Sequence, residues 1–255
     1  MSVFGTYSNY YDLLYKDKDY AAEANHVDQV LQRCLPGAQS ILELGCGTGA
    51  HAVHLIKKGY DIHGVDLSPA MLARAEKNRA QLDPARHRHL SFSIGDIRNV
   101  QLKSTFDAVI ALFHVISYLP KNEDIQAVLS TVKSQLKKGG IFFFDCWYGP
   151  AVLTEKPEMR MKHFENDRYK IIRKAEPKML ANANIVEVKY KLIAEEKTNG
   201  RVEKIEETHR MRYFFKPEIE MFLSLAGFQL VEFFEWMTCL EPELSTWNVC
   251  FVGQL

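Results

Sequence analysis

The sequence predicts an α/β protein: a mostly parallel β-sheet with helices on both faces, plus an inserted antiparallel β region late in the chain. Short apolar strands alternate with amphipathic helices up to about residue 147. Two of these strands, DAVIAL and IFFF, are almost wholly apolar, as expected for strands buried on both faces. Between residues 159 and 215, charged and apolar residues alternate with a period of two, which favours antiparallel strands with one solvated face.

The first part of the chain supplies the parallel core. Alanine, valine and leucine at helical spacing predict a helix over residues 20–35, which Pro36-Gly37 ends. Ser68-Pro69 offers a capping serine and a proline at the first helical position, so a helix begins there. We expect strands over residues 40–44, 60–65, 90–94, 106–112 and 141–144, and further helices over residues 48–58 and 122–137, the last ended by Gly139-Gly140.

The chain changes character after Trp147-Tyr148-Gly149-Pro150. The stretches IVEVKYKLIAE and RVEKIEETHRMRYF flank Thr198-Asn199-Gly200, and Asn-Gly between two alternating runs predicts a β-hairpin. A helix over residues 217–226 and strands over residues 228–235 and 246–252 then resume the core. We therefore expect a cofactor-binding core with an N-terminal cap segment (1–150), an antiparallel insertion that builds a substrate pocket or dimer interface (151–215), and the end of the core sheet (216–255).

Composition argues against several function classes. Among 255 residues, Lys+Arg 32 balance Asp+Glu 32, so bulk charge gives no case for a nucleic-acid or membrane-surface partner. No apolar run approaches the roughly 18 residues that a membrane span needs, and the N-terminus lacks a signal-peptide pattern. Five scattered cysteines without a CxxC motif predict reduced thiols. We expect a cytoplasmic protein without nucleic-acid or membrane partners.

The strongest chemical signal is ILELGCGTG at residues 41–49. Glycines after a strand let the backbone approach a ligand closely, and the following helix points its N-terminus at that ligand. Gly45, Gly47 and Ala50 satisfy the G-x-G-x-x-G/A pattern of dinucleotide enzymes. The same loop, with Gly49 and a preceding acid, satisfies the pattern of S-adenosyl-L-methionine (SAM) methyltransferases. The glycines alone leave both cofactor classes open.

Acidic neighbours favour SAM. Glu43 lies two residues before the first glycine, where a carboxylate suits the ammonium and sulfonium of SAM better than a pyrophosphate. Asp66 ends the second strand, 21 residues after Gly45, at a spacing that suits ribose hydroxyls in either cofactor class. Asp96 follows the third strand and is placed to accept from an adenine amino group. Leu67 and Met71 are apolar candidates for packing on the adenine ring.

The motifs ELGCGTG, VDLSPAML and GDIR together resemble the class I SAM-dependent methyltransferase family. The resemblance implies a seven-stranded, mostly parallel Rossmann-like sheet with one antiparallel strand near its end, SAM as cofactor and S-adenosyl-L-homocysteine as product. The chain looks most like N-methyltransferases of nucleotide-linked amino sugars, through YYDLLYKDKDY (10–20), FHVISYL (113–119) and THRMRYFFKP (208–217). Those enzymes carry a His or Tyr where Tyr118 falls, whereas His114 is extra. The closer resemblance favours a homodimer.

The chemistry of methyl transfer indicates which residues to consider for catalysis and substrate binding. The sulfonium already activates the methyl group, so the protein must mainly align an unprotonated acceptor. The catalytic candidates are Tyr11, Tyr118 and His114; by the resemblance Tyr11 faces the transferring methyl. Trp147 and Tyr148 are the substrate candidates, because ligands bind at the carboxyl end of strands in open α/β sheets. The cofactor-binding candidates are Tyr20, Glu43, Gly45, Cys46, Gly47, Asp66, Leu67, Met71, Asp96, Ile97 and Leu112.

We therefore predict a SAM-dependent methyltransferase with a small-molecule acceptor, favouring an amine and extending to a nucleotide-linked amino sugar. Three alternatives stay open: a methyltransferase for an oxygen, carbon or small free amine acceptor, a non-catalytic SAM-binding subunit, and an NAD-dependent oxidoreductase. We expect no metal site, because His51 and His54 lie one helical turn apart without a suitably spaced third ligand.

Overall fold

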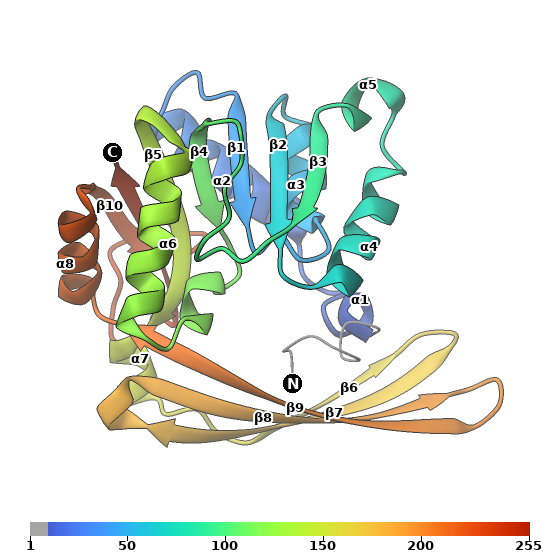
Figure 1. The fold of residues 1–255 in the computed structure, drawn as a ribbon. Coiled ribbons are helices and arrows are strands. Elements are labelled where there is room, and N and C mark those ends of the chain that lie inside the picture. Colours follow the sequence, from blue (N-terminus) through green and yellow to red (C-terminus); the bar gives the residue numbers. More distant parts are fainter. Residues whose placement is uncertain (1–9) are drawn as a thin grey trace.

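The computed structural model describes residues 10–255 (Figure 1); the first nine residues of the predicted cap segment lie outside the described residues. The helices are α1 (Tyr11–Leu14), α2 (Tyr20–Cys34), α3 (Ala50–Ile56), α4 (Pro69–Arg79), α5 (Pro84–His87), η2 (Val115–Tyr118), α6 (Asn122–Gln135), α7 (Gly149–Thr154), η3 (Ala181–Ala183) and α8 (Lys216–Ala226). The strands are β1 (Ser40–Leu44), β2 (Asp61–Asp66), β3 (Leu90–Ile94), β4 (Phe106–Ala111), β5 (Leu136–Tyr148), β6 (Arg160–Glu165), β7 (Tyr169–Leu180), β8 (Ile185–Glu196), β9 (Arg201–Phe214), β10 (Gln229–Glu235) and β11 (Asn248–Gln254).

The core sheet has the predicted topology. Strands β3-β2-β1-β4-β5 are parallel in that order, β11 pairs antiparallel with β5, and β10 pairs antiparallel with β11. Within residues 10–255 the core sheet therefore runs β3-β2-β1-β4-β5-β11-β10, and β11 is its antiparallel member. The predicted Rossmann-like α/β fold is confirmed. No helix within this range is long and apolar enough to cross a membrane.

Two apolar cores lie on the two faces of this sheet. Along β4, Val109 and Ala111 face a core that α6 and α8 cover, whereas Ala108 and Ile110 face a core that α2 and α3 cover. Burial on both faces explains why β4 is apolar at successive positions instead of alternating. Ser68 caps α4 as predicted, because its hydroxyl accepts a hydrogen bond from the Met71 amide at 3.3 Å.

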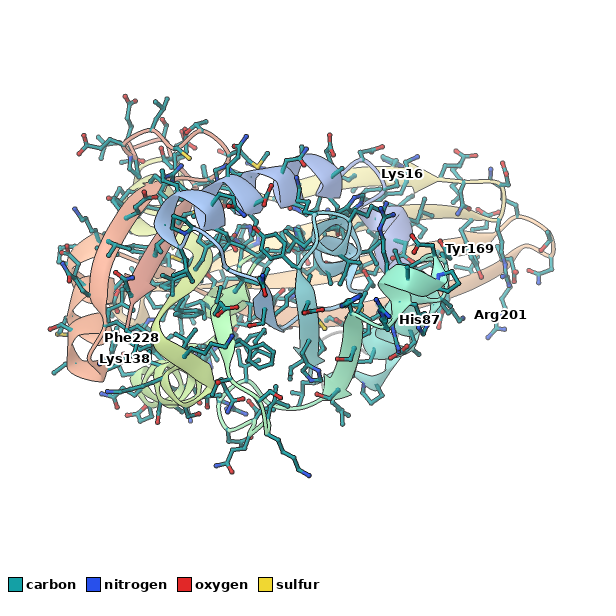
Figure 2. The ribbon with its side chains drawn as sticks, turned by 90° about the horizontal axis from the view of Figure 1, so that it is seen from above. Lys16, His87, Lys138, Tyr169, Arg201 and Phe228 are labelled. Atoms are coloured by element: carbon teal, nitrogen blue, oxygen red, sulfur yellow. The ribbon has the colours of Figure 1, made fainter. Side chains whose placement is uncertain are left out.

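The charged, alternating region forms a second, antiparallel sheet. Strands β6, β7, β8 and β9 pair in chain order, so the predicted hairpin is β8–β9 and two more strands precede it. Figure 1 shows this long sheet crossing beneath the carboxyl ends of the parallel strands, with α1 between α4 and the sheet. Seen from above in Figure 2, Tyr169 and Arg201 mark one end of the antiparallel sheet, away from Phe228 and Lys138.

A short seam and an apolar cluster join the two sheets. Trp147 and Tyr148 at the end of β5 pair in parallel with Tyr213 and Phe214 of β9. A third apolar cluster fills the space under α1, joining residues of α1 and Met71 to inward-facing residues of β6–β9. The antiparallel sheet is thereby held against the edge where a ligand of a parallel sheet binds.

The start of β5 differs from its prediction. We expected Gly139-Gly140 to end the preceding helix and a strand to begin at Ile141, but β5 begins at Leu136 and includes both glycines. Gly139 adopts a φ of 77°, and the pairing with β4 shifts register between Phe106 and Ala108. Glycine tolerates this left-handed backbone, so β5 begins with an irregular segment. Two consecutive glycines are also typical of a turn, which is why the sequence predicted a helix end here.

Candidate active site

The glycine loop after β1 has a backbone that only glycine adopts easily. Gly45, Gly47 and Gly49 have φ values of 69°, 55° and 67°. A β-carbon on Gly45 would lie 2.5 Å from Val115 Cγ2, and one on Gly49 would lie 2.6 Å from Phe92 Cζ. A β-carbon on Gly47 would instead meet only the Met71 methyl carbon, at 3.6 Å. Packing explains the outer two glycines, whereas the space beside Gly47 is open for a ligand.

Asp66, at the end of β2, holds this loop in place. Its carboxylate accepts hydrogen bonds from the amides of Gly47 and Ser68, both at 2.8 Å. Burial raises the pKa of Asp66, and these amide hydrogen bonds partly oppose the increase. The predicted ribose-binding carboxylate therefore lies beside the open space at Gly47.

Glu43 is a buried carboxylate without a full set of partners. It is 2% exposed, and its Oε2 atom has no hydrogen-bond partner among the described residues. The His51 ring lies beside it, with Nδ1 3.7 Å from Oε1. Burial, together with the charge of Asp66, raises the pKa of Glu43 from 4.5 to about 8. A cation bound beside Glu43 would favour its ionised form, and the ammonium of SAM is a cation of the right kind.

A chain of polar side chains leads from Glu43 to the half-buried Lys18. The Nε2 atom of His51 lies 2.7 Å from Glu23, which in turn pairs with Lys18. Burial favours a higher pKa for Glu23, but its hydrogen bonds with His51 and Lys18 outweigh burial and lower it. The Tyr20 ring packs edge-on against His51, with centroids 5.0 Å apart, which places this predicted cofactor residue beside the same chain.

The other predicted cofactor residues have mixed environments. Leu67 follows Asp66 and is 63% exposed, which leaves an apolar side chain available at the edge of the loop. Asp96 already accepts hydrogen bonds from Arg98, and this contact lowers its pKa. Four predicted residues pack inward or partly inward: Cys46, Met71 and Leu112 are buried, and Ile97 lies against the core under α6. Their role in cofactor binding stays a prediction.

A group of tyrosines lies between the core and the antiparallel sheet. Tyr11 in α1 is 8% exposed, and its hydroxyl hydrogen-bonds to Tyr20. Burial raises the pKa of both phenols. Neighbouring tyrosines, including Tyr118, add to the increase at Tyr11, whereas the hydrogen bond with Tyr11 partly opposes it at Tyr20. The structure thus brings Tyr118 of the FHVISYL motif together with Tyr11 and Tyr20, which both belong to the N-terminal YYDLLYKDKDY motif.

Tyr118 contacts His209, which in turn contacts Glu207; neither partner is among the residues predicted from the sequence. Its hydroxyl lies 2.8 Å from Nδ1 of His209, and Nε2 of His209 lies 3.3 Å from Glu207. Both residues belong to β9, on the face that Ile205 and Met211 also occupy. The sequence could have marked both residues as candidates, because they are polar residues at inward-facing positions of an alternating strand. Buried polar side chains require hydrogen-bond partners.

His114 contacts a different buried acid, Asp145 at the end of β5, which the sequence analysis also missed. The amide of His114 donates to both carboxylate oxygens of Asp145 at 3.1 Å, and its Nδ1 atom lies 2.7 Å from Oδ2. Phe113 and His114 both have left-handed backbones, with φ values of 63° and 65°. Two consecutive residues with such strain mark a constrained loop at the candidate site.

The two predicted substrate residues point to different environments. The Trp147 ring lies 6.3 Å from the His114 ring, between centroids, and near Trp247. Tyr148 instead packs against Phe233, at 5.7 Å. Successive residues of a strand face opposite sides, so only Trp147 joins the His114 region. Substrate contact by Trp147 and Tyr148 stays a prediction.

Comparisons with known proteins agree with this geometry. A family model described as a methyltransferase domain matches residues 41–140, which contain the glycine loop, Asp66 and Asp96. The chain is 32% identical to dTDP-3-amino-3,4,6-trideoxy-alpha-D-glucopyranose N,N-dimethyltransferase of Streptomyces venezuelae over 151 residues. That alignment covers 58% of this chain and 60% of the relative, so it spans less than two thirds of the relative's length.

Two further matches extend over most of the chain. The chain is 28% identical to dTDP-3-amino-3,6-dideoxy-alpha-D-glucopyranose N,N-dimethyltransferase of Streptomyces fradiae, over 90% of this chain and 86% of the relative. The crystal structure of DesVI from Streptomyces venezuelae superimposes with a TM-score of 0.79 at 25% identity, and the match covers 99% of each chain. The antiparallel sheet as well as the core therefore has a counterpart in this similar structure.

Proposed function

We propose, since the chain belongs to the class I SAM-dependent methyltransferase family, that it methylates the amino group of a small molecule, a nucleotide-linked amino sugar. The observation that carries the proposal is the buried Glu43 carboxyl, whose Oε2 atom lacks a hydrogen-bond partner among the described residues, at the sheet edge that the tyrosine group also borders. The similarity to two dTDP-amino-sugar dimethyltransferases supports the choice of acceptor.

The chain's own residues have separable tasks in this reaction. SAM, when bound, supplies a methyl group activated by its sulfonium. Glu43 would hold a cationic part of SAM, and Asp66, fixed by the amides of Gly47 and Ser68, would hold ribose hydroxyls. Tyr11 and Tyr118 would align the acceptor nitrogen from the opposite side. Alignment of this kind can supply on the order of 7–11 kcal/mol of the barrier reduction.

A cavity at one end of the antiparallel sheet suits a phosphate-bearing acceptor. Its volume is about 470 Å³, and its lining includes Arg74, Arg168 and Arg201 together with Glu196 and Glu203. Guanidinium groups recognise phosphate oxygens with two parallel hydrogen bonds. The cavity begins at Tyr10, next to Tyr11, and includes Tyr169, which Figure 2 shows near Arg201. This position supports an extended acceptor with its amine near Tyr11 and its phosphates near the arginines.

The direct test is methyl transfer from labelled SAM to a matched panel of acceptors. The panel contains dTDP-linked 3-amino and 4-amino sugars, the corresponding hydroxyl sugars, and glycine and sarcosine. We expect methylation of a dTDP-amino sugar and none of its hydroxyl counterpart, because the amine is the proposed nucleophile. Transfer confined to glycine, sarcosine or a hydroxyl sugar would contradict the proposed acceptor while leaving the reaction class intact.

A further inference from the structure

Glu207, His209 and Tyr118 form a hydrogen-bonded chain between the two sheets. Tyr118 lies in η2, just after β4 of the core, whereas His209 and Glu207 lie in β9 of the antiparallel sheet. The Tyr118 hydroxyl and His209 Nδ1 are 2.8 Å apart, and His209 Nε2 and Glu207 Oε2 are 3.3 Å apart. His209 is 2% exposed, so these contacts replace hydration of its ring nitrogens.

The inventory of donors and acceptors gives this chain a direction. An ionised glutamate only accepts hydrogen bonds, so Nε2 of a neutral His209 must carry the proton. Its Nδ1 atom is then an acceptor, and the Tyr118 hydroxyl must donate to it. The Tyr118 hydroxyl therefore donates its hydrogen to His209, and its oxygen can receive a proton from the nitrogen of the substrate.

Within residues 10–255, side chains of three elements approach His209. Glu207 lies on the same strand, Tyr118 approaches from η2, and the Tyr190 ring of β8 packs edge-on at 4.9 Å between centroids. Burial raises the pKa of Tyr190 to about 12, so this phenol is neutral at physiological pH. Arg173 of β7 lies over the outer side of the Tyr190 ring, 5.5 Å from its centroid. Glu207, with Oε2 3.3 Å from Nε2, is the acid placed to favour the Nε2-protonated tautomer of His209.

We propose that His209, oriented by Glu207, positions Tyr118 and takes its proton while Tyr118 accepts a proton from the ammonium form of the substrate amine; this rests on the proposed function. In that transfer the N–H bond of the substrate ammonium breaks and an O–H bond forms on Tyr118. The original Tyr118 O–H bond breaks as an N–H bond forms on His209 Nδ1. The substrate keeps the electron pair as a neutral amine, and His209 becomes an imidazolium beside the Glu207 carboxylate.

The polarity of the chain can be tested without any acceptor. In nitrogen-15 NMR of the histidine-labelled protein saturated with S-adenosyl-L-homocysteine, His209 should show a protonated Nε2 and an unprotonated Nδ1. Glu207→Gln should reduce the preference for this tautomer, because an amide can donate as well as accept. A neutral His209 protonated on Nδ1 in the unmodified protein would overturn the proposal, since Tyr118 would then accept from it.

A double-mutant cycle tests whether His209 acts through Tyr118. We expect Tyr118→Phe and His209→Asn each to lower kcat about 100-fold with the preferred acceptor, within the usual range for acid–base groups. The double variant should be no slower than the slower single variant, because both substitutions break the same proton path. Multiplication of the two losses, or unchanged kcat in His209→Asn, would overturn the proposal.

Two controls separate this role from structure and from the proposed function. His163→Asn, at an exposed position of β6, makes the same substitution elsewhere in the antiparallel sheet and should leave kcat unchanged. Where His209→Asn fails to bind S-adenosyl-L-homocysteine, Glu207→Gln replaces it, with an expected 10-fold loss of kcat and a displaced acidic limb of its pH profile. Methylation of hydroxyl acceptors alone would refute the proposed amine acceptor. The tautomer measurement needs no acceptor, so it tests the proposed role of His209 independently.

Discussion

The cofactor side and the acceptor side of the candidate site share one edge of the sheet but draw on different parts of the chain. On the cofactor side, Asp66 accepts from the Gly47 amide, 19 residues away, across neighbouring parallel strands. On the acceptor side, Tyr118 contacts His209, 91 residues away, across two different sheets. A parallel core fixes the first contact through local motifs, whereas the second depends on how the antiparallel sheet docks.

This comparison predicts that substitutions on the two sides fail differently. The cofactor side should lose binding of S-adenosyl-L-homocysteine, whereas the acceptor side should keep that binding and lose turnover. Four variants, ordered from the largest expected effect to the smallest, test this division.

Gly47→Val should have the largest effect. Its side chain would occupy the open space at the loop, so affinity for S-adenosyl-L-homocysteine should fall at least about 1,000-fold, roughly 4 kcal/mol. Left-handed backbone strain should cost the fold only about 1–2 kcal/mol, because the nearest atom to a β-carbon there is 3.6 Å away. Isothermal titration and urea unfolding measure the two quantities. Unchanged affinity would refute the location of the cofactor site.

Glu43→Gln should weaken binding of S-adenosyl-L-homocysteine about 30-fold, from roughly 2 kcal/mol of lost charge pairing. In the unmodified protein the pKa of Glu43 is raised to about 8, so near pH 7 the carboxyl is largely protonated. A bound ammonium favours the carboxylate, so binding should release up to about one proton and strengthen as pH rises toward 8. Titration in buffers of different ionisation enthalpy measures this release, which Glu43→Gln should abolish.

The raised pKa of Glu43 also predicts how the stability of the protein without cofactor changes with pH. Folded Glu43 holds its proton above the pH at which the unfolded side chain loses it, so the stability that it contributes is lost as pH rises from about 4.5 to 8. Glu43→Gln should flatten that decline in urea unfolding of the protein without cofactor. A decline of equal slope in both proteins would contradict the assignment of the raised pKa.

Tyr11→Phe should slow methyl transfer about 10-fold, from the loss of one hydrogen bond of roughly 1.4 kcal/mol that aligns the acceptor side. Affinity for S-adenosyl-L-homocysteine should stay within about twofold, since the ring and its packing remain. Tyr60→Phe is the matched control, because Tyr60 is also buried and hydrogen-bonded, to Asp28 at 2.7 Å, but lies before β2 at the opposite end of the strands. Turnover equal to that of the unmodified protein would remove Tyr11 from the mechanism.

Arg201→Gln should have the smallest effect. We expect the KM for a dTDP-linked amine to rise about fivefold, about 1 kcal/mol, with little change in kcat, because a partly solvated phosphate contact contributes uniform binding. Arg160→Gln, an exposed arginine of β6, is the control. Equal KM values for Arg201→Gln and the unmodified protein would remove the cavity at Tyr169 from the acceptor site.

Local sequence patterns were sufficient to predict the elements of the parallel core. The alternation of strands and helices, the Ser68 cap and the glycine loop all appear in the structure where the sequence places them, within one or two residues at most boundaries. These features depend on interactions between residues close in sequence, so their patterns are visible locally. The start of β5 is the exception, because Gly139 and Gly140 are equally compatible with a turn and with an irregular strand.

The sequence by itself determined the fold class, the resemblance to a methyltransferase family and the candidate cofactor acids Glu43 and Asp66. A short strand followed by a glycine loop places these two acids without help from distant segments. Only the tertiary structure decided which side chains join Tyr118 and His114. His209 and Asp145 reach them from other strands. Their pairing depends on the docking of two sheets and on the backbone of residues 113–114, neither of which has a local sequence period.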